Sequence, residues 1–213
     1  MFKNIWDRKF QSKDWGKYPD LSIVRLTKKR YKSGKGKKVL EIGFGGGANL
    51  IFFTLENFTT FGIDVSKNAK KQAYKNLKRV NKKARLEIGY SNNLPFEKKY
   101  FDLVVDCECL YSTNLKIFNE TLLEIKRVLK PGKIFITKTF ASGSYNDGYK
   151  KIRGGNKIYK NKKGFIKRYM NISDIYKFYG KYFKIISIEK EERTILSRKK
   201  KIKEWVIEMQ NVE

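Results

Sequence analysis

A carboxylate followed by a cluster of glycines is the part of this sequence with the clearest capacity to bind a ligand. Glu41 precedes Gly43, Gly45, Gly46 and Gly47. Glycine has no β-carbon, so such a turn permits positive φ angles and lets a bulky ligand lie against bare backbone. An ordinary tight turn needs only one or two glycines. We therefore interpret this stretch as a ligand-binding turn.

The residues on either side predict the elements that hold this turn. Val39, Leu40 and Ile42 are typical of a short strand buried on both faces, and a helix is expected to begin near Ala48. In open α/β sheets, nucleotides and related ligands bind at the carboxyl end of such a strand, close to the N-terminus of the next helix. The turn therefore lies where a doubly wound sheet would bind its ligand.

A second acid, Asp64, ends the next predicted strand, residues 59–64. It follows the glycines by about twenty residues, the spacing at which an acid accepts hydrogen bonds from ribose hydroxyls. Asp is also common at the start of helices, but Ser66 already supplies an N-cap for the helix that follows. We therefore predict that Asp64 binds a ribose.

Two kinds of ligand are compatible with these residues. Residues 43–48 satisfy the G-x-G-x-x-G/A fingerprint of dinucleotide-binding proteins. A pyrophosphate gains nothing from a carboxylate at Glu41, however, whereas a ligand with an ammonium group would be stabilised by one. The residues alone leave both ligands open and favour the second.

Three stretches resemble a known family. Residues 41–47, Glu-Ile-Gly-Phe-Gly-Gly-Gly, resemble the first motif of class I S-adenosylmethionine-dependent methyltransferases, and residues 94–105 and 124–132 resemble the small-molecule branch known as type 11. The resemblance implies S-adenosylmethionine as the cofactor, with Glu41 near its methionine moiety and Asp64 on its ribose hydroxyls. The other cofactor-binding residues implied around these two acids are Gly43, Phe44, Gly45, Gly47 and Val65.

The stretch after the third predicted strand, residues 85–89, departs from the family. In the type 11 branch it frames the adenine, and an acid usually reaches the exocyclic amine, but Tyr90 stands at that position here. Backbone amides of Ser91 and Asn92, or the Asn92 side chain, are expected to substitute. The adenine-binding residues implied by the resemblance are thus Ser91, Asn92, Asn93 and Leu94.

Asp106, Cys107, Glu108 and Tyr111 follow the fourth predicted strand. In a doubly wound sheet this strand end faces the glycine turn, so they should border the reacting methyl group, with Asp106 and Cys107 on the cofactor. Neither the Asn-Pro-Pro-Tyr motif of exocyclic-amine methylases nor the Pro-Cys nucleophile of cytosine-C5 enzymes is present. With no histidine in the chain, a general base must be Asp106, Glu108 or Tyr111, and Glu108 and Tyr111 are our catalytic candidates. Alternatively, the cysteines only pack and Glu108 faces solvent.

Length and composition indicate one folded domain. The chain has 213 residues, 40% hydrophobic and 15% aromatic, and contains no run near the ~20 apolar residues that a membrane span requires. Its two cysteines, spaced C-x-C in a chain without histidine, make a poor metal site, so we expect no metal. Free thiols and an N-terminus without an apolar signal core predict a cytoplasmic protein.

The net charge of +28 has two explanations. Nucleic-acid-binding proteins carry such charge because Lys and Arg neutralise phosphates. The basic residues here are 39 Lys and only 10 Arg, however, which also fits a genome biased towards A/T-rich codons. We favour a solvated basic surface, with a polyanionic or phosphorylated substrate as the alternative.

Two segments flank the predicted cofactor-binding core, residues 37–140. Residues 1–34 combine tryptophans with a short amphipathic helix, and are expected either to cap the pocket or to pack on the sheet edge. Residues 141–168 are expected to form an irregular loop on the acceptor side, with nine Lys and Arg between positions 150 and 168 and no acid there. This basic loop would recognise a phosphorylated or nucleotide-linked acceptor, or be a mobile surface loop.

We therefore predict a single α/β domain over residues 1–213, with a Rossmann-like, doubly wound sheet of seven strands. The sheet is mostly parallel, and a helix and an antiparallel hairpin of strands 183–188 and 202–209 close it within residues 169–213. By resemblance, the function is in-line methyl transfer from S-adenosylmethionine to a small-molecule or glycan-type acceptor. The alternatives are an RNA methyltransferase that uses the basic surface, and a non-catalytic or NAD-binding protein of similar fold.

Overall fold

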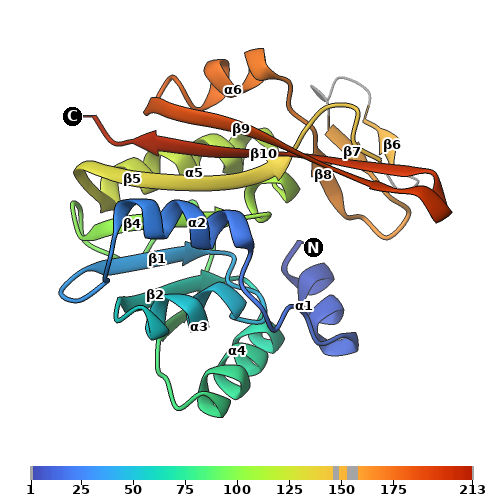
Figure 1. Cartoon of the computed structure of the whole chain (residues 1–213). Helices are drawn as coiled ribbons and strands as arrows, with labels where there is room; N and C mark the ends of the chain where they lie inside the picture. The colour runs from blue at the N-terminus through green and yellow to red at the C-terminus, as the bar shows by residue number, and fades with distance from the viewer. Residues whose placement is uncertain (1, 146–148, 153–157, 213) are drawn as a thin grey trace.

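The computed structural model describes residues 2–145, 149–152 and 158–212. Its centre is a seven-stranded sheet in the order β3-β2-β1-β4-β5-β10-β9 (Figure 1). The strands are β1 (Lys38–Ile42), β2 (Thr59–Asp64), β3 (Arg85–Ile88), β4 (Phe101–Cys107), β5 (Leu129–Phe140), β9 (Lys184–Ile195) and β10 (Lys200–Gln210). Strands β1 to β5 are parallel, and β10 lies antiparallel between β5 and β9. The predicted Rossmann-like sheet is confirmed.

Helices cover both faces of this sheet. They are α2 (Leu21–Arg30), α3 (Ala48–Leu55), α4 (Lys67–Arg79), α5 (Leu115–Val128) and α6 (Ile172–Phe178). Successive strand residues point to opposite faces. Leu40 accordingly belongs to the core shared with α5 and α6, and its neighbour Val39 to the core shared with α2 and α3. Among the described helices, none is both long and apolar enough to cross a membrane.

The second half of the sheet differs in its boundaries from the prediction. Both hairpin strands are longer than predicted. Helix α5 begins at Leu115 because Asn114 caps it, its Oδ1 accepting a hydrogen bond from the Ile117 amide (2.9 Å). Pro131 and Gly132 lie within β5. The pairing of β4 with β5 shifts register there, so the missing N–H of proline is tolerated.

The N-terminal segment contains two helices rather than the one predicted. Helix α2 matches the predicted amphipathic helix, whereas α1 (Phe2–Ser12) was not expected. Asp7 of α1 accepts hydrogen bonds at Oδ1 from the Ser66 hydroxyl (2.8 Å) and the Asn68 amide (3.0 Å). These bonds fasten α1 to the N-terminus of α4, close to the end of β2.

The expectation of an irregular loop over residues 141–168 is wrong for its described parts. They contain a small antiparallel sheet of β6 (Lys150–Lys151), β7 (Ile158–Lys160) and β8 (Ile166–Arg168). Residues 153–157 of the basic run lie outside the described residues. Figure 1 shows this sheet and α1 at the same edge of the molecule, beyond the carboxyl ends of β1 and β5.

Candidate active site

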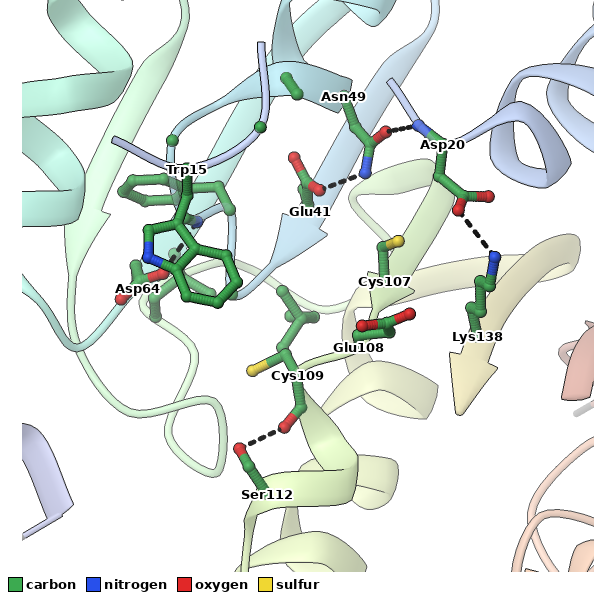
Figure 2. A pocket seen from close by; sticks show the side chains of 18 of the residues that line it. Trp15, Asp20, Glu41, Asn49, Asp64, Cys107, Glu108, Cys109, Ser112 and Lys138 are labelled. Carbon is green, nitrogen blue, oxygen red and sulfur yellow. Dashed lines mark hydrogen bonds and ion pairs between the residues drawn. The ribbon is translucent and has the colours of Figure 1, made fainter. Parts of the chain in front are cut away.

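A cavity of about 670 Å³ lies at the carboxyl ends of β1, β2 and β4 (Figure 2). The strand order reverses between β1 and β4, which is where open α/β sheets bind ligands. The volume is within the usual range for cofactor and small-molecule pockets. The predicted site residues on its wall are Glu41, Gly43, Phe44, Gly45, Asp64, Val65, Ser91, Cys107, Glu108 and Tyr111.

The glycine turn approaches its neighbours too closely for side chains. A β-carbon on Gly46 would lie 2.3 Å from the carbonyl oxygen of Trp15, and one on Gly43 (φ 71°) would lie 2.3 Å from the Cys109 Sγ. The turn is thus held between the N-terminal segment and the end of β4. Gly47, expected to bind the cofactor, does not line the cavity; it is the N-cap of α3 and turns the chain into that helix.

Glu41 is a buried carboxylate with one satisfied oxygen. Its Oε1 accepts a hydrogen bond from Asn49 Nδ2 (2.8 Å), and its Oε2 is buried without a partner. Burial, with Asp64 and Asp106 nearby, raises the pKa of Glu41 to about 8. The site therefore has a place for a cation or hydrogen-bond donor next to the glycine turn.

A chain of polar contacts extends from Glu41 to the far side of the cavity (Figure 2). Asn49 Oδ1 accepts a bond from the Asp20 amide (2.9 Å), and the Asp20 carboxylate pairs with Lys138 Nζ (2.8 Å). Lys138 is buried and also pairs with Glu191 (2.9 Å), and these partners raise its pKa. Sequence reasoning missed all of these residues except Glu41. Asn49 alone carried a local signal, as a polar residue at the start of an apolar helix.

Asp64 ties the second strand to the glycine turn. Its Oδ2 accepts a hydrogen bond from the Gly45 amide (3.0 Å), and its Oδ1 accepts one from the Ser66 amide (2.9 Å). The residue is 8% exposed and borders the cavity beside Val65, and burial raises its pKa. The carboxylate is therefore oriented towards the cavity by the backbone on both sides.

The predicted adenine-binding stretch lies only partly on the cavity. Tyr90 and Ser91 line it, whereas Asn92, Asn93 and Leu94 do not. The Asn92 side-chain amide donates to a carboxylate of α5, and so does the Leu94 backbone amide. Leu94 itself is buried in the core. The two α5 acceptors, Glu120 (2.8 Å) and Glu124 (2.7 Å), draw this stretch away from the cavity.

Asp106 is fully buried and does not line the cavity, contrary to the prediction that it contacts the cofactor. Its Oδ1 accepts hydrogen bonds from the amides of Cys109 (2.9 Å) and Leu110 (3.1 Å), and its Oδ2 accepts one from Thr137 Oγ1 (2.6 Å). Burial raises its pKa to about 6. Asp106 shapes the turn after β4, and its oxygens are not available as a general base.

Glu108 and Tyr111 leave that turn and face the cavity. Glu108 adopts φ 56°, a strained conformation for a non-glycine residue. Burial and the neighbouring Glu204 raise the pKa of Glu108 to about 8, against the opposing effect of Lys138. Burial also raises the pKa of Tyr111 far above its usual value, so its phenol stays protonated. The expectation that Glu108 faces solvent does not hold.

The N-terminal segment forms one wall of the cavity. Trp6 and Phe10 of α1, and Trp15 after it, line the same space as the glycine turn. The Gln72 side-chain amide of α4 donates to the carbonyl oxygens of Phe10 and Lys13, which holds this wall in place. Of the two roles expected for residues 1–34, the structure places these aromatics over the pocket.

The known proteins that this chain resembles in sequence are methyltransferases. Residues 40–137 match the type 11 methyltransferase domain family. A stretch of 107 residues is 34% identical to phthiotriol/phenolphthiotriol dimycocerosates methyltransferase of Mycobacterium tuberculosis, covering 47% of this chain and 36% of that protein. The match thus spans little more than a third of that relative.

Solved structures share the fold over most of the chain. A methyltransferase of Methanosarcina mazei superposes with a TM-score of 0.72 at 19% identity, covering 86% of this chain and 96% of the other. The 1,6-didemethyltoxoflavin-N1-methyltransferase of Burkholderia thailandensis, solved with S-adenosylhomocysteine, gives 0.70 at 16% identity and covers 97% and 82%. Residues 40–137 thus form a methyltransferase domain of the type 11 family, and most of the chain shares the fold of S-adenosylmethionine-dependent methyltransferases.

Proposed function

We propose that this chain transfers a methyl group from S-adenosylmethionine to a small-molecule or glycan-type acceptor. The observation that carries the proposal is Glu41 Oε2, a buried oxygen without a partner on the cavity that also holds the glycine turn and Asp64. A buried carboxylate is unfavourable unless a cation or donor joins it. The ammonium group of the cofactor's methionine moiety is such a partner.

The remaining lining residues fit the other parts of the cofactor. Gly43 and Gly45 present bare backbone, and Asp64, which accepts bonds from backbone amides, retains acceptor capacity for ribose hydroxyls. Tyr90 and Ser91 form the wall on the adenine side. When bound, the cofactor supplies a methyl group activated by its sulfonium.

We assign the proton transfer to Glu108. Its raised pKa, about 8, lies close to physiological pH. Its carboxylate is therefore a stronger base than that of an ordinary glutamate. The proton of an acceptor O–H or N–H would pass to its carboxylate oxygen. Tyr111 keeps its own proton and acts by orienting the acceptor. Enclosure between the N-terminal wall and the strand ends positions the reactants and excludes water.

The charges on the cavity support an acceptor other than a nucleic-acid backbone. Among the described lining residues, five carboxyl groups face one lysine, although the whole chain carries +28. The carboxyl groups belong to Asp20, Glu41, Asp64, Glu108 and Glu191. The single lysine already pairs with Asp20 and Glu191, so this space offers phosphates no free cation, whereas the basic exterior attracts them.

Calorimetric titration with S-adenosylhomocysteine tests the proposal, with Asp64→Ala as the variant and the exposed Glu97→Ala as control. We expect binding by the wild type and the control, and loss of at least about tenfold in affinity in a still-folded Asp64→Ala protein. Undiminished binding by Asp64→Ala would refute the ribose assignment. A preference for NAD(H) in the same titration would refute the cofactor.

Transfer of labelled methyl into host lysate then identifies the acceptor class. RNA, protein, glycan and small-molecule pools are separated after reaction with the wild type or Asp64→Ala. Label in the small-molecule or glycan pool, absent with the variant, is the expected result. Label in RNA would instead show that the basic surface binds the acceptor.

A further inference from the structure

The side-chain nitrogen of Lys9, on helix α1, is surrounded by aromatic rings. Its Nζ lies 4.2 Å from the ring centroid of Trp15, 4.7 Å from that of Trp6 and 4.8 Å from that of Phe165. All three distances are within the roughly 6 Å at which a cation is attracted to the face of a ring. Aromatic cages of this kind also bind methylated ammonium groups. Lys9 is thus a half-buried lysine whose surroundings suit its methylated form.

A second, smaller cavity of about 290 Å³ has Lys9 on its wall and meets the larger cavity described above. The residues that line both cavities are Trp6, Trp15, Glu108 and Tyr111. Glu108 also favours the charged form of Lys9, which places the two groups near each other. The amine of Lys9 therefore lies beside the proposed proton acceptor of the methyl-transfer site.

The surroundings of Lys9 also make its nitrogen more nucleophilic. Burial, together with Lys167 and Lys13, lowers the pKa of Lys9 to about 8. Glu108 opposes this effect without cancelling it. At pH 7.5 a lysine with such a pKa is roughly one-quarter neutral amine, against about 0.1% for an ordinary lysine. The neutral amine has the lone pair that an attack on a methyl group requires, so burial prepares Lys9 for this chemistry.

We infer that the protein methylates its own Lys9, with bound S-adenosylmethionine as the methyl donor. The flexible side chain carries the amine past Glu108 into the larger cavity. The lone pair of Nζ attacks the methyl carbon, the N–C bond forms as the C–S bond breaks, and S-adenosylhomocysteine is released. The product is a methylammonium ion, which returns to the aromatic cage; before any second transfer its proton passes to the Glu108 carboxylate. The inference adds a protein acceptor to the proposed function and rests on it for the cofactor.

The first test supplies the purified full chain with S-adenosylmethionine that carries a trideuterated methyl group, without any other acceptor. Peptide mass spectrometry then locates the label, and methyl groups acquired during expression are counted on the same peptides. We expect at least about tenfold more methyl on Lys9 than on exposed lysines, because their amines are almost fully protonated. Asp64→Ala should leave Lys9 unlabelled. The rate per molecule should not depend on protein concentration; a proportional rise would overturn the inference, because transfer would then occur between molecules.

Two lysine-to-arginine variants form a matched pair. Lys9→Arg keeps the positive charge and should eliminate the principal site of labelling. Lys13→Arg is the control, because Lys13 lies over the same Trp15 ring (5.3 Å) but is exposed and is not among the described residues that line either cavity. It should leave the labelling of Lys9 unchanged. Equal labelling of Lys9 and Lys13 in the wild type would overturn the inference.

A second measurement needs no cofactor. The lysines of the ligand-free chain are dimethylated chemically with ¹³C-labelled formaldehyde and a borohydride, and their methyl resonances are recorded by NMR. The resonance of Lys9, identified by its absence from Lys9→Arg, should be displaced upfield by the surrounding rings. A position among the resonances of exposed lysines would overturn the inference, because the cage would then not hold the methylated group.

Binding of S-adenosylhomocysteine, measured first by calorimetry, separates this inference from the proposed function. If that ligand binds and Lys9 stays unmethylated, self-methylation is wrong and the proposed function stands. If the ligand does not bind, both are wrong.

Discussion

Two carboxyl groups on the larger cavity, the buried Glu41 and the half-buried Glu108, both have raised pKa values but differ in their neighbours. Glu41 has one oxygen without a partner, and Glu108 has a second carboxyl group, Glu204, beside it. In both cases burial is the main cause of a pKa near 8. Near neutral pH the ligand-free site therefore holds both groups largely protonated, and a bound cation would favour their charged forms.

The variant Glu41→Gln should lower the affinity for S-adenosylhomocysteine without lowering the stability of the protein. Glutamine keeps an oxygen that can accept the Asn49 bond, but it removes the negative charge that a bound ammonium group would meet. We expect the affinity for S-adenosylhomocysteine to fall by about tenfold or more. The melting temperature of the ligand-free protein should not fall near neutral pH, because burial keeps Glu41 largely protonated there and glutamine is a neutral replacement of similar shape. Unchanged affinity would contradict the role of Glu41.

The pH dependence of stability tests the protonation of Glu108. Its folded-state pKa of about 8 lies above the ordinary value of 4.5, so the folded state holds this proton more tightly than the unfolded state. The resulting stability is present below pH 4.5 and is lost as the pH rises to about 8.

Urea denaturation of the ligand-free protein at pH 5 and pH 8 measures this loss. Relative to wild type, Glu108→Gln should gain about 1–2 kcal/mol at pH 8 compared with pH 5, because glutamine does not titrate. Glu97→Gln, on the surface, is the control. Parallel pH profiles for wild type and Glu108→Gln would show that Glu108 has an ordinary pKa.

At the scale of elements, the site depends on a close contact between the glycine turn and the segment after α1. The Trp15 carbonyl oxygen approaches Gly46 so closely that no β-carbon fits. Asp20, at the start of α2, then links the same segment to Asn49 and Lys138. The N-terminal segment thus lines the cavity that we propose for the cofactor.

The variant Gly46→Ala tests this contact. Its β-carbon would lie 2.3 Å from the Trp15 carbonyl oxygen, so the segment carrying Trp15 must move. We expect S-adenosylhomocysteine to bind at least about tenfold more weakly and proteolysis of residues 12–20 to become faster. The control is Gly36→Ala, where φ is 73° and an added β-carbon meets nothing within 4 Å. It should lose about 1 kcal/mol of stability and no affinity.

At the scale of the whole molecule, basic and acidic groups are segregated. The chain carries +28, whereas the described charged residues around the larger cavity are mainly acidic. The basic exterior therefore attracts polyanions over a long range, whereas the acidic residues around the larger cavity do not attract them. The two effects can be separated by their dependence on salt.

Salt should affect RNA binding and cofactor binding differently. Between about 50 and 200 mM NaCl, affinity for a single-stranded RNA should fall by at least tenfold, because phosphate contacts release counterions. Affinity for S-adenosylhomocysteine should change by less than about twofold, because its contacts are buried. Fluorescence anisotropy and calorimetry give the two values. RNA binding that persists at the higher salt, with methyl transfer to that RNA, would contradict the small-molecule proposal.

Local sequence predicted the centre of the fold because the residues that form it are close together in the chain. The apolar run of β1, the glycine turn and Asp64 at the end of β2 are read from short-range patterns, and the structure puts them on one cavity. Gly47 is an exception, since its role in starting α3 depends on helix geometry. The small sheet in residues 141–168 was missed because its strands are very short and rich in lysine.

Local sequence was enough to predict the family that residues 40–137 match, the sheet, and the two acids on the larger cavity, because hydrophobic periodicity and turn chemistry specify them. The tertiary structure alone decided which polar residues reach that cavity. Hydrogen bonds to α5 draw Asn92 and Leu94 away, and bonds to Thr137 and the turn amides occupy Asp106. Folding also brings Asp20 and Lys138, far apart in the chain, into contact on the wall of the larger cavity. Such contacts depend on chain topology, and no local pattern encodes them.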